Sequence, residues 1–201
     1  MQSTPVKYIL GPDTKWAFVN VSKPVSSGEY GVGKYAITLL IDKGSDEIGK
    51  ISKVLKEIYE ANKAMFVKDG KQLTLKELHL PVLDGDEKRP DNPDFSNKYF
   101  INAQSKYKPE VVDEALNPVD PASVHSGDCG RVSLQLFAYN VDDGAAGIGC
   151  RLNNLQRISV AETKNTDFAT AKDDFAEFVK KDVVASSDVD STYVTDEEIP
   201  F

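Results

Sequence analysis

The chain has 201 residues, enough for one domain and a tail, because domains usually run to about 100–200 residues. Its hydrophobic content of 40% supports a real core, but no run of about 18 apolar residues and no signal-peptide pattern occurs, which predicts a cytoplasmic protein without a membrane span. The net charge of −8 argues at first against nucleic acid. However, six carboxylates and no Lys or Arg follow position 181, and removing them from −8 leaves −2 for residues 1–181. A nearly balanced body can carry the basic patch of a DNA-binding protein.

The first half of the chain reads as two strands followed by one helix. Residues 15–21 and 34–41 are rich in β-branched and aromatic side chains, with a turn-rich stretch between them. The apolar period then becomes helical from Ile48 to Phe66, with Ser45 as a candidate N-cap and Gly70 beyond the end. This pattern predicts an amphipathic helix of about 20 residues that packs on the sheet.

The second half predicts further strands and long loops. Residues 71–80 are helical or irregular, and 84–94 form a loop by composition. Strands are expected at 97–104, 131–140 and 148–152, with 158 as the farthest end of the last one, and a short helix is expected at 167–181.

These elements predict a mainly β protein with one long helix (α+β), with an OB-fold-like small β-barrel as the leading architecture and another α+β sheet as the alternative. The expected organisation is a body over residues 1–160, a short helix or linker over 161–181 and a disordered acidic tail over 182–201.

The most informative interior segment is the strand at 131–140. Alternation places Val132, Leu134, Leu136 and Ala138 on one face, which has the composition of a core. The other face carries Arg131, Ser133, Gln135, Phe137 and Tyr139. Aromatic rings stack on unpaired bases and Arg contacts phosphate, so this face predicts a ligand surface, with Arg151 of the return strand nearby. In the alternative interpretation, Phe137 and Tyr139 pack under a covering loop.

Aromatic and cationic residues also lie side by side elsewhere in the chain, as a sequence-tolerant single-strand groove requires. Trp16 and Phe18 are expected in the core rather than in a binding site. The stacking candidates are Tyr35, Tyr99, Tyr107, Phe137 and Tyr139. The phosphate-binding candidates are Lys98, Lys106, Lys108, Arg131 and Arg151.

Catalytic signatures are weak. Asp84, Asp86 and Glu87 suggest a magnesium-dependent nuclease only faintly, because adjacent acids in a Pro/Gly loop are usually solvated. The two cysteines, expected as free thiols, and the two histidines lie far apart and form no zinc signature. The motif Gly147-Ile148-Gly149 lacks the rest of a phosphate-loop pattern and indicates close backbone approach instead. No catalytic residue, cofactor or metal is predicted.

The last residues combine charge with an apolar end. The tip is Asp196, Glu197, Glu198, Ile199, Pro200 and Phe201. An aromatic ring beside a terminal carboxylate suits a basic pocket with an apolar floor on another protein. This tip resembles the C-terminal tip of bacterial single-stranded DNA-binding proteins, which implies recruitment of replication or recombination proteins or competition for the chain's own DNA groove.

The body also resembles a known family. The blocks "FVNVSKP" (18–24), "KYAITLLIDK" (34–43), "LDGDEKRP" (83–90), "YFINAQSKYKPEVVD" (99–113), "SGDCGRVSLQLFAYN" (126–140) and "GIGCRLNNLQRI" (147–158) occur in the order seen in tailed-phage single-stranded DNA-binding proteins with an OB-fold. The resemblance implies non-catalytic binding of single-stranded DNA in the host cytoplasm during phage replication or recombination. For the block at 83–90, one hypothesis is that Lys88 and Arg89 contact DNA. The rival function is an adaptor without nucleic acid, acting through its tail. A homo-oligomer is compatible with the sequence.

Overall fold

The computed structural model describes residues 2–27, 32–68, 70–141 and 145–161. The described residues belong to one compact unit. The expected helix at 167–181 and the acidic tail therefore lie outside the described residues. The fold is mainly β, as the sequence predicts.

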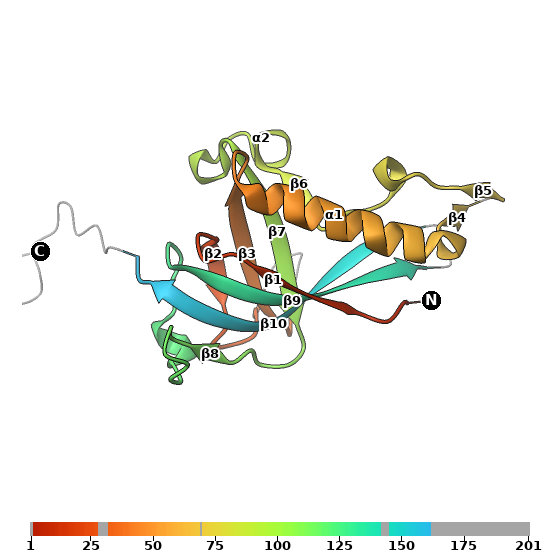
Figure 1. Cartoon of the computed structure of the whole chain (residues 1–201). Helices are drawn as coiled ribbons and strands as arrows, with labels where there is room; N and C mark the ends of the chain where they lie inside the picture. Colours follow the sequence, from red (N-terminus) through yellow and green to blue (C-terminus); the bar gives the residue numbers. More distant parts are fainter. Residues whose placement is uncertain (1, 28–31, 69, 142–144, 162–201) are drawn as a thin grey trace, which may run out of the picture. The chain divides into compact units, whose positions relative to one another are not determined.

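The strands of the described residues, coloured along the chain in Figure 1, are β1 (Val6–Leu10), β2 (Lys15–Asn20), β3 (Tyr35–Asp42), β4 (Val67–Lys68), β5 (Lys71–Gln72), β6 (Val82–Asp84), β7 (Lys98–Ser105), β8 (Val111–Val112), β9 (Cys129–Asn140) and β10 (Ala146–Ser159). The α-helices are α1 (Asp46–Ala61) and α2 (Gly85–Lys88).

Five of these strands pair in a closed cycle, in the order β9, β2, β3, β7, β10 and back to β9. The pairings are antiparallel except for β7 with β10, which is parallel. Two seams are narrow, since β2 meets β9 only at Lys15 and Cys129, and β7 meets β10 only at Gln104 and Arg151. Strands β1, β6 and β8 extend the cycle along β9, β7 and β10.

The inside of this cycle is the hydrophobic core. Val132, Leu134, Leu136 and Ala138 of β9 are fully buried, which confirms the core face predicted from alternation. Trp16 is also fully buried, as expected, whereas Phe18 is 53% exposed, and the prediction that it belongs to the core is wrong. The reason is a bulge in β2 after Ala17, which turns Phe18 outward.

Helix α1 lies along one side of the strands (Figure 1) and buries Ile51, Leu55 and Ile58. It begins as predicted, because Ser45 accepts a hydrogen bond from the Glu47 amide. It ends at Ala61, earlier than the sequence suggests. The Asn62 side chain donates to the Ile58 carbonyl at 2.7 Å and stops the helix, although the apolar pattern continues.

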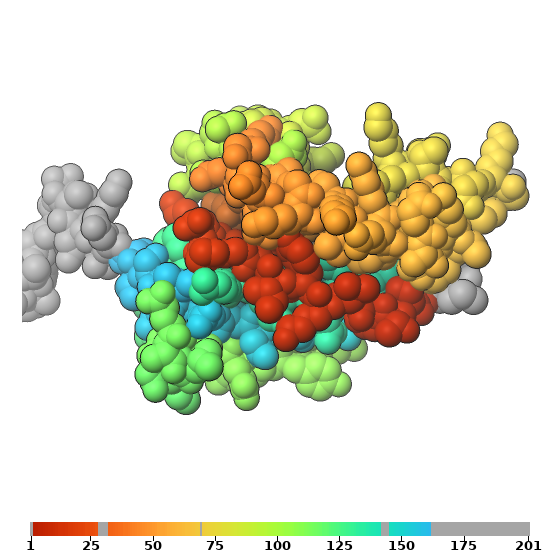
Figure 2. Space-filling model, in the orientation of Figure 1, coloured from red at the N-terminus to blue at the C-terminus, as the bar shows by residue number. Residues whose placement is uncertain are grey.

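Strand β1 lies beside α1 on the face shown in Figure 2, where the red N-terminal segment runs under the orange helix. The Tyr8 hydroxyl of β1 donates a hydrogen bond to the Glu47 carboxylate of α1. Desolvation and this carboxylate raise the pKa of the Tyr8 hydroxyl. The helix and the first strand therefore cover this face of the strand cycle together.

The segment after α1 explains the apolar pattern that continues beyond the helix. Residues 63–65 form a 3-10 turn, and Phe66 is fully buried and stacks on Tyr59 with ring centroids 5.7 Å apart. Another 3-10 turn, Pro93–Phe95, follows α2 in the region expected to be a loop. No helix in the described ranges has the length and apolar character needed to cross a bilayer.

Candidate nucleic-acid interface

An open groove of about 460 Å³ lies on the outer surface of the strand cycle, where β7, β9 and β10 come together. Its lining combines cations, amides and two aromatic rings. The lining residues are Lys34, Asn102, Gln104, Ser105, Lys106, Tyr107, Phe137, Cys150 and Arg151. The long-range parallel contact of β7 with β10 assembles this groove, because it sets Gln104 beside Arg151.

Phe137 and Arg151 form the aromatic and cationic part of the groove. Phe137 lies opposite Gly149 in the β9–β10 ladder, and a Cβ at position 149 would approach the ring to 2.6 Å. The absence of a side chain therefore lets the ring lie across β10. The Arg151 guanidinium lies 5.4 Å from the centroid of this ring and donates to Gln135 Oε1 at 3.3 Å. Ring and guanidinium together offer a half-exposed surface on which a base could stack.

The neighbouring strands add hydrogen-bonding groups. Lys34 Nζ donates to Gln104 Oε1 at 3.3 Å, and the Thr38 hydroxyl donates to Asn102 Oδ1 at 2.9 Å. Asn102 is exposed and Gln104 half-buried. Amides of this kind contact sugar, phosphate or base edges without fixing a sequence.

The end of β7 supplies exposed charge. Lys106 and Lys108 are exposed, and Tyr107 is 80% exposed. The ion pairs of the described residues involve none of the groove cations Lys34, Lys106 and Arg151. Their charge is therefore free to meet phosphates, which is the main source of affinity for a nucleic-acid strand.

Four of the ten predicted DNA contacts line the groove, namely Lys106, Tyr107, Phe137 and Arg151. Lys108 follows them in sequence. The sequence pointed to Lys34 only as a neighbour of Tyr35 and not as a phosphate contact, and it missed Asn102 and Gln104. The amides had a usable signal, since they alternate with the buried Ile101 and Ala103 in β7.

The other candidates lie elsewhere. Tyr35 and Tyr99 each lie two residues from a buried isoleucine, Ile37 in β3 and Ile101 in β7. They therefore face the inside of the strand cycle and do not share the outer face with Phe137. Lys98 forms an ion pair with Asp42 at the opposite end of β7 from the groove.

Two further candidates, on β9, are held by neighbours. Arg131 donates to Gln156 at 3.1 Å across the β9–β10 ladder. Tyr139 is half-buried beside Gly147, and burial raises the pKa of its hydroxyl.

The acidic loop after β6 has a structural role that the sequence did not reveal. Lys43 Nζ lies 2.7 Å from carboxylate oxygens of both Asp84 and Asp86, and these hydrogen bonds lower the pKa of both acids. Asp84 also caps α2, and Asp86 accepts from the Asn97 amide. Within the described residues, no group of three or more His, Cys, Asp or Glu side chains is arranged to hold a metal ion.

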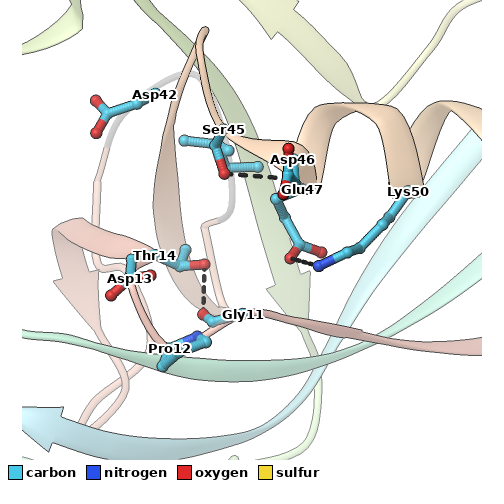
Figure 3. A pocket seen from close by; sticks show the side chains of 10 residues that line it. Gly11, Pro12, Asp13, Thr14, Asp42, Ser45, Asp46, Glu47 and Lys50 are labelled. Atoms are coloured by element: carbon cyan, nitrogen blue, oxygen red, sulfur yellow. Dashed lines mark hydrogen bonds and ion pairs between the residues drawn. The ribbon is translucent and has the colours of Figure 1, made fainter.

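A second pocket, of about 270 Å³, lies at the N-terminus of α1 (Figure 3). Asp13, Asp42, Asp46 and Glu47 line it, together with Lys50. Because four carboxylates surround this pocket, it repels a phosphate backbone, and the groove at Phe137 is the better nucleic-acid site.

The family model described as "Enterobacter phage Enc34, ssDNA-binding protein" matches residues 6–185. The chain belongs to this family. The family resemblance seen in the sequence is thereby confirmed. A search of curated protein sequences gives no match.

Solved structures of family and related proteins share the fold. The single-stranded DNA-binding protein of bacteriophage Enc34 in complex with ssDNA matches with a TM-score of 0.61 and 21% identity, over 78% of this chain and 88% of that one. Its C-terminal truncation matches with a TM-score of 0.60 and 23% identity, over 78% and 87%. The single-stranded DNA-binding protein gp2.5 of bacteriophage T7 matches with a TM-score of 0.54 and 15% identity, over 81% and 97%.

Proposed function

We propose that the chain binds single-stranded DNA with little sequence preference and protects exposed strands during phage replication and recombination, in the cytoplasm of the host. We further propose that its strand cycle is an OB-fold barrel, a five-stranded architecture that binds oligonucleotides. Five strands pair in the closed cycle β2, β3, β7, β10, β9, and only the β7–β10 pairing is parallel. This arrangement supports the assignment. Family membership and the ssDNA complex of the Enc34 protein support the ligand.

The observation that carries the proposal is the Phe137–Arg151 pair in a groove whose cations form no ion pair with any carboxylate among the described residues. Stacking on an aromatic ring is worth about 1–3 kcal/mol per base and works for every base. Phosphate contacts with Lys34, Lys106 and Arg151 add affinity that is independent of sequence and sensitive to salt. A duplex keeps its bases stacked inside, so it gains nothing from Phe137.

The proposed mode of action is binding without catalysis. Of the three acids that suggested a nuclease, Asp84 and Asp86 are held by Lys43. The adaptor hypothesis expects Phe137 to be buried and no groove, whereas Phe137 is half-exposed in one. We propose that the tip Asp196–Phe201 recruits replication or recombination proteins.

Substitution in the groove tests the proposal. Phe137→Ala should weaken binding of a fluorescent oligo-dT by about tenfold, and Arg151→Gln by a similar factor. The matched control is Leu116→Ala, an exposed apolar residue outside the groove lining. Wild-type affinity in both groove variants would refute this location of the site.

A separate truncation tests the tail. Removal of residues 182–201 should tighten DNA binding if the tail competes for the groove. Removal of Phe201 alone should mainly weaken capture of a host replication protein. Unchanged DNA affinity in the longer truncation would reject competition and leave recruitment as the role of the tail.

A further inference from the structure

Phe18 has a backbone conformation that folding alone would not favour. Its φ is +47°, in the left-handed region, and its side chain is 53% exposed. It lies in the bulge of β2 between Ala17 and Asn20, and the Asn20 side chain donates to the Phe18 carbonyl at 3.1 Å. Glycine or asparagine adopts such a φ at lower cost, so the exposed ring is held here at an energetic cost. Leu116 shares such a backbone and exposure, and what distinguishes Phe18 is its surroundings.

The exposed ring has a cation beside it. The Arg89 guanidinium lies 5.9 Å from the centroid of Phe18, 5.4 Å from that of Phe95 and 6.0 Å from that of Phe100. Phe95 and Phe100 are buried, and the rings of Phe18 and Phe95 are 6.2 Å apart. These rings hold the guanidinium on the surface of the protein.

The donors of Arg89 are available to a ligand. The residue is exposed, and within the described ranges its side chain makes no hydrogen bond or ion pair. The nearby cations differ, because Lys43 is held by Asp84 and Asp86, and Lys98 by Asp42. A guanidinium stacked on aromatic rings with its edges free is well suited to contact a phosphate.

This surface continues the groove described above. Gln104, Asn102 and Phe100 are alternate residues that point to the same side of β7. The first two line the groove, whereas Phe100 is buried against Phe95, beneath the Arg89 guanidinium. Four residues of strand span roughly 13 Å. Between the two ends lies Thr38, bonded to Asn102 and paired in register with Ala17.

We propose that Phe18 and Arg89 form a second nucleotide-binding site, in which Phe18 stacks on a base and Arg89 contacts the adjoining phosphate of the same single strand that occupies the groove at Phe137. The inference rests on the proposed function and adds the path of the strand, along the outer face of β7 and β3 from Arg151 to Arg89. A DNA strand long enough to reach both sites gains binding affinity from each.

The test uses the full chain and oligo-dT of about 4 to 16 nucleotides, the range that OB-folds occupy. Phe18→Asn removes the ring while keeping a residue that accepts the left-handed φ, so the fold should tolerate it. We expect about tenfold weaker binding of the longest oligonucleotides. Arg89→Lys keeps the charge but loses the stacked plane and should also weaken binding. Leu116→Asn is the matched control, since Leu116 is exposed and has a φ of +64°.

A photocrosslink gives a readout independent of stability. Oligo-dT carrying 5-iododeoxyuridine should crosslink to the peptide that contains Phe18, identified by mass spectrometry. Unchanged affinity of Phe18→Asn overturns the proposal even if a crosslink forms, and so does weaker binding without a crosslink at Phe18. In both cases tight binding by the wild type leaves the proposed function standing. Absence of binding by the wild type would refute the proposed function itself.

Discussion

Phe137 and Gly149 stand opposite each other in the β9–β10 ladder, and the ring of one occupies the space where the other would carry a side chain. A Cβ at position 149 would meet two ring carbons at 2.6 Å. The glycine thus leaves room for the ring over β10, where the Arg151 guanidinium lies 5.4 Å from the ring centroid.

Gly149→Ala should therefore displace the Phe137 ring and lower affinity for oligo-dT several-fold. Overpacking of this kind typically costs about 1–3 kcal/mol, so the free energy of unfolding should fall in urea titrations. Gly49→Ala is the control, because the residue is in α1 and a Cβ added there would meet no atom within 4 Å. That substitution should stabilise the protein by about 0.5–1 kcal/mol. Equal stability changes in the two variants would contradict the packing described for Gly149.

Leu134→Ala should test the core of the strand cycle. Leu134 is fully buried, and a Leu→Ala change in such a core costs about 2–5 kcal/mol through lost burial and the cavity left behind. Leu116→Ala, at an exposed position, should change stability by less than about 0.5 kcal/mol. Chemical denaturation gives the free energy of unfolding of both variants. A loss at Leu134 as small as that at Leu116 would contradict the placement of Leu134 in the core.

The Lys43 contacts predict how stability depends on pH. Hydrogen bonds from Lys43 lower the pKa of Asp84 and Asp86 in the folded state, so these acids stabilise the fold above their unfolded pKa of about 4. This contribution should disappear as the pH falls through the lower, folded values. Lys43→Met should lower the melting temperature at neutral pH and flatten its acid dependence. If the melting temperature of Lys43→Met fell with acid as much as that of the wild type, the Lys43 contacts would not be the cause of the acid dependence.

Cys150 offers a chemical probe of the core beneath the groove, because it stands opposite the buried Leu136 in the β9–β10 ladder and packs against the core. Burial raises the pKa of its thiol to about 12, so little thiolate exists at about pH 8. Iodoacetamide should alkylate Cys150 slowly in the folded protein and quickly in urea, as measured by mass spectrometry of the Cys150 peptide. Fast alkylation in the native state would show that the thiol is not buried as described.

The sequence predicted what depends on local pattern. Alternation over residues 131–140 identified the buried Val132 and Leu134 and placed Phe137 on the other face, because a strand repeats every two residues. Arg151 could be placed near Phe137 because a hairpin brings its two strands together. Ser45 carried its own N-cap signal.

The remaining features depend on distant partners. Strand β1 was missed because its five residues are a strand only through pairing with β9, more than 120 positions later. Asn102 and Gln104 reach the groove through the β7–β10 seam, which no local pattern encodes. Phe18 was assigned to the core because the bulge that turns it outward depends on register with β3.

The most direct test of the central claim is a fluorescence-anisotropy titration of the full chain with oligo-dT and with a duplex of equal length, at ~50 mM and ~200 mM salt. Because only a single strand presents bases that can stack on Phe137, it should bind more tightly than the duplex at both salt concentrations. Because the groove cations bind phosphates, the affinity should fall steeply as the salt concentration rises. Equal affinity for the duplex, or affinity for the single strand that does not change with salt, would contradict a single-strand groove built on Phe137 and Arg151.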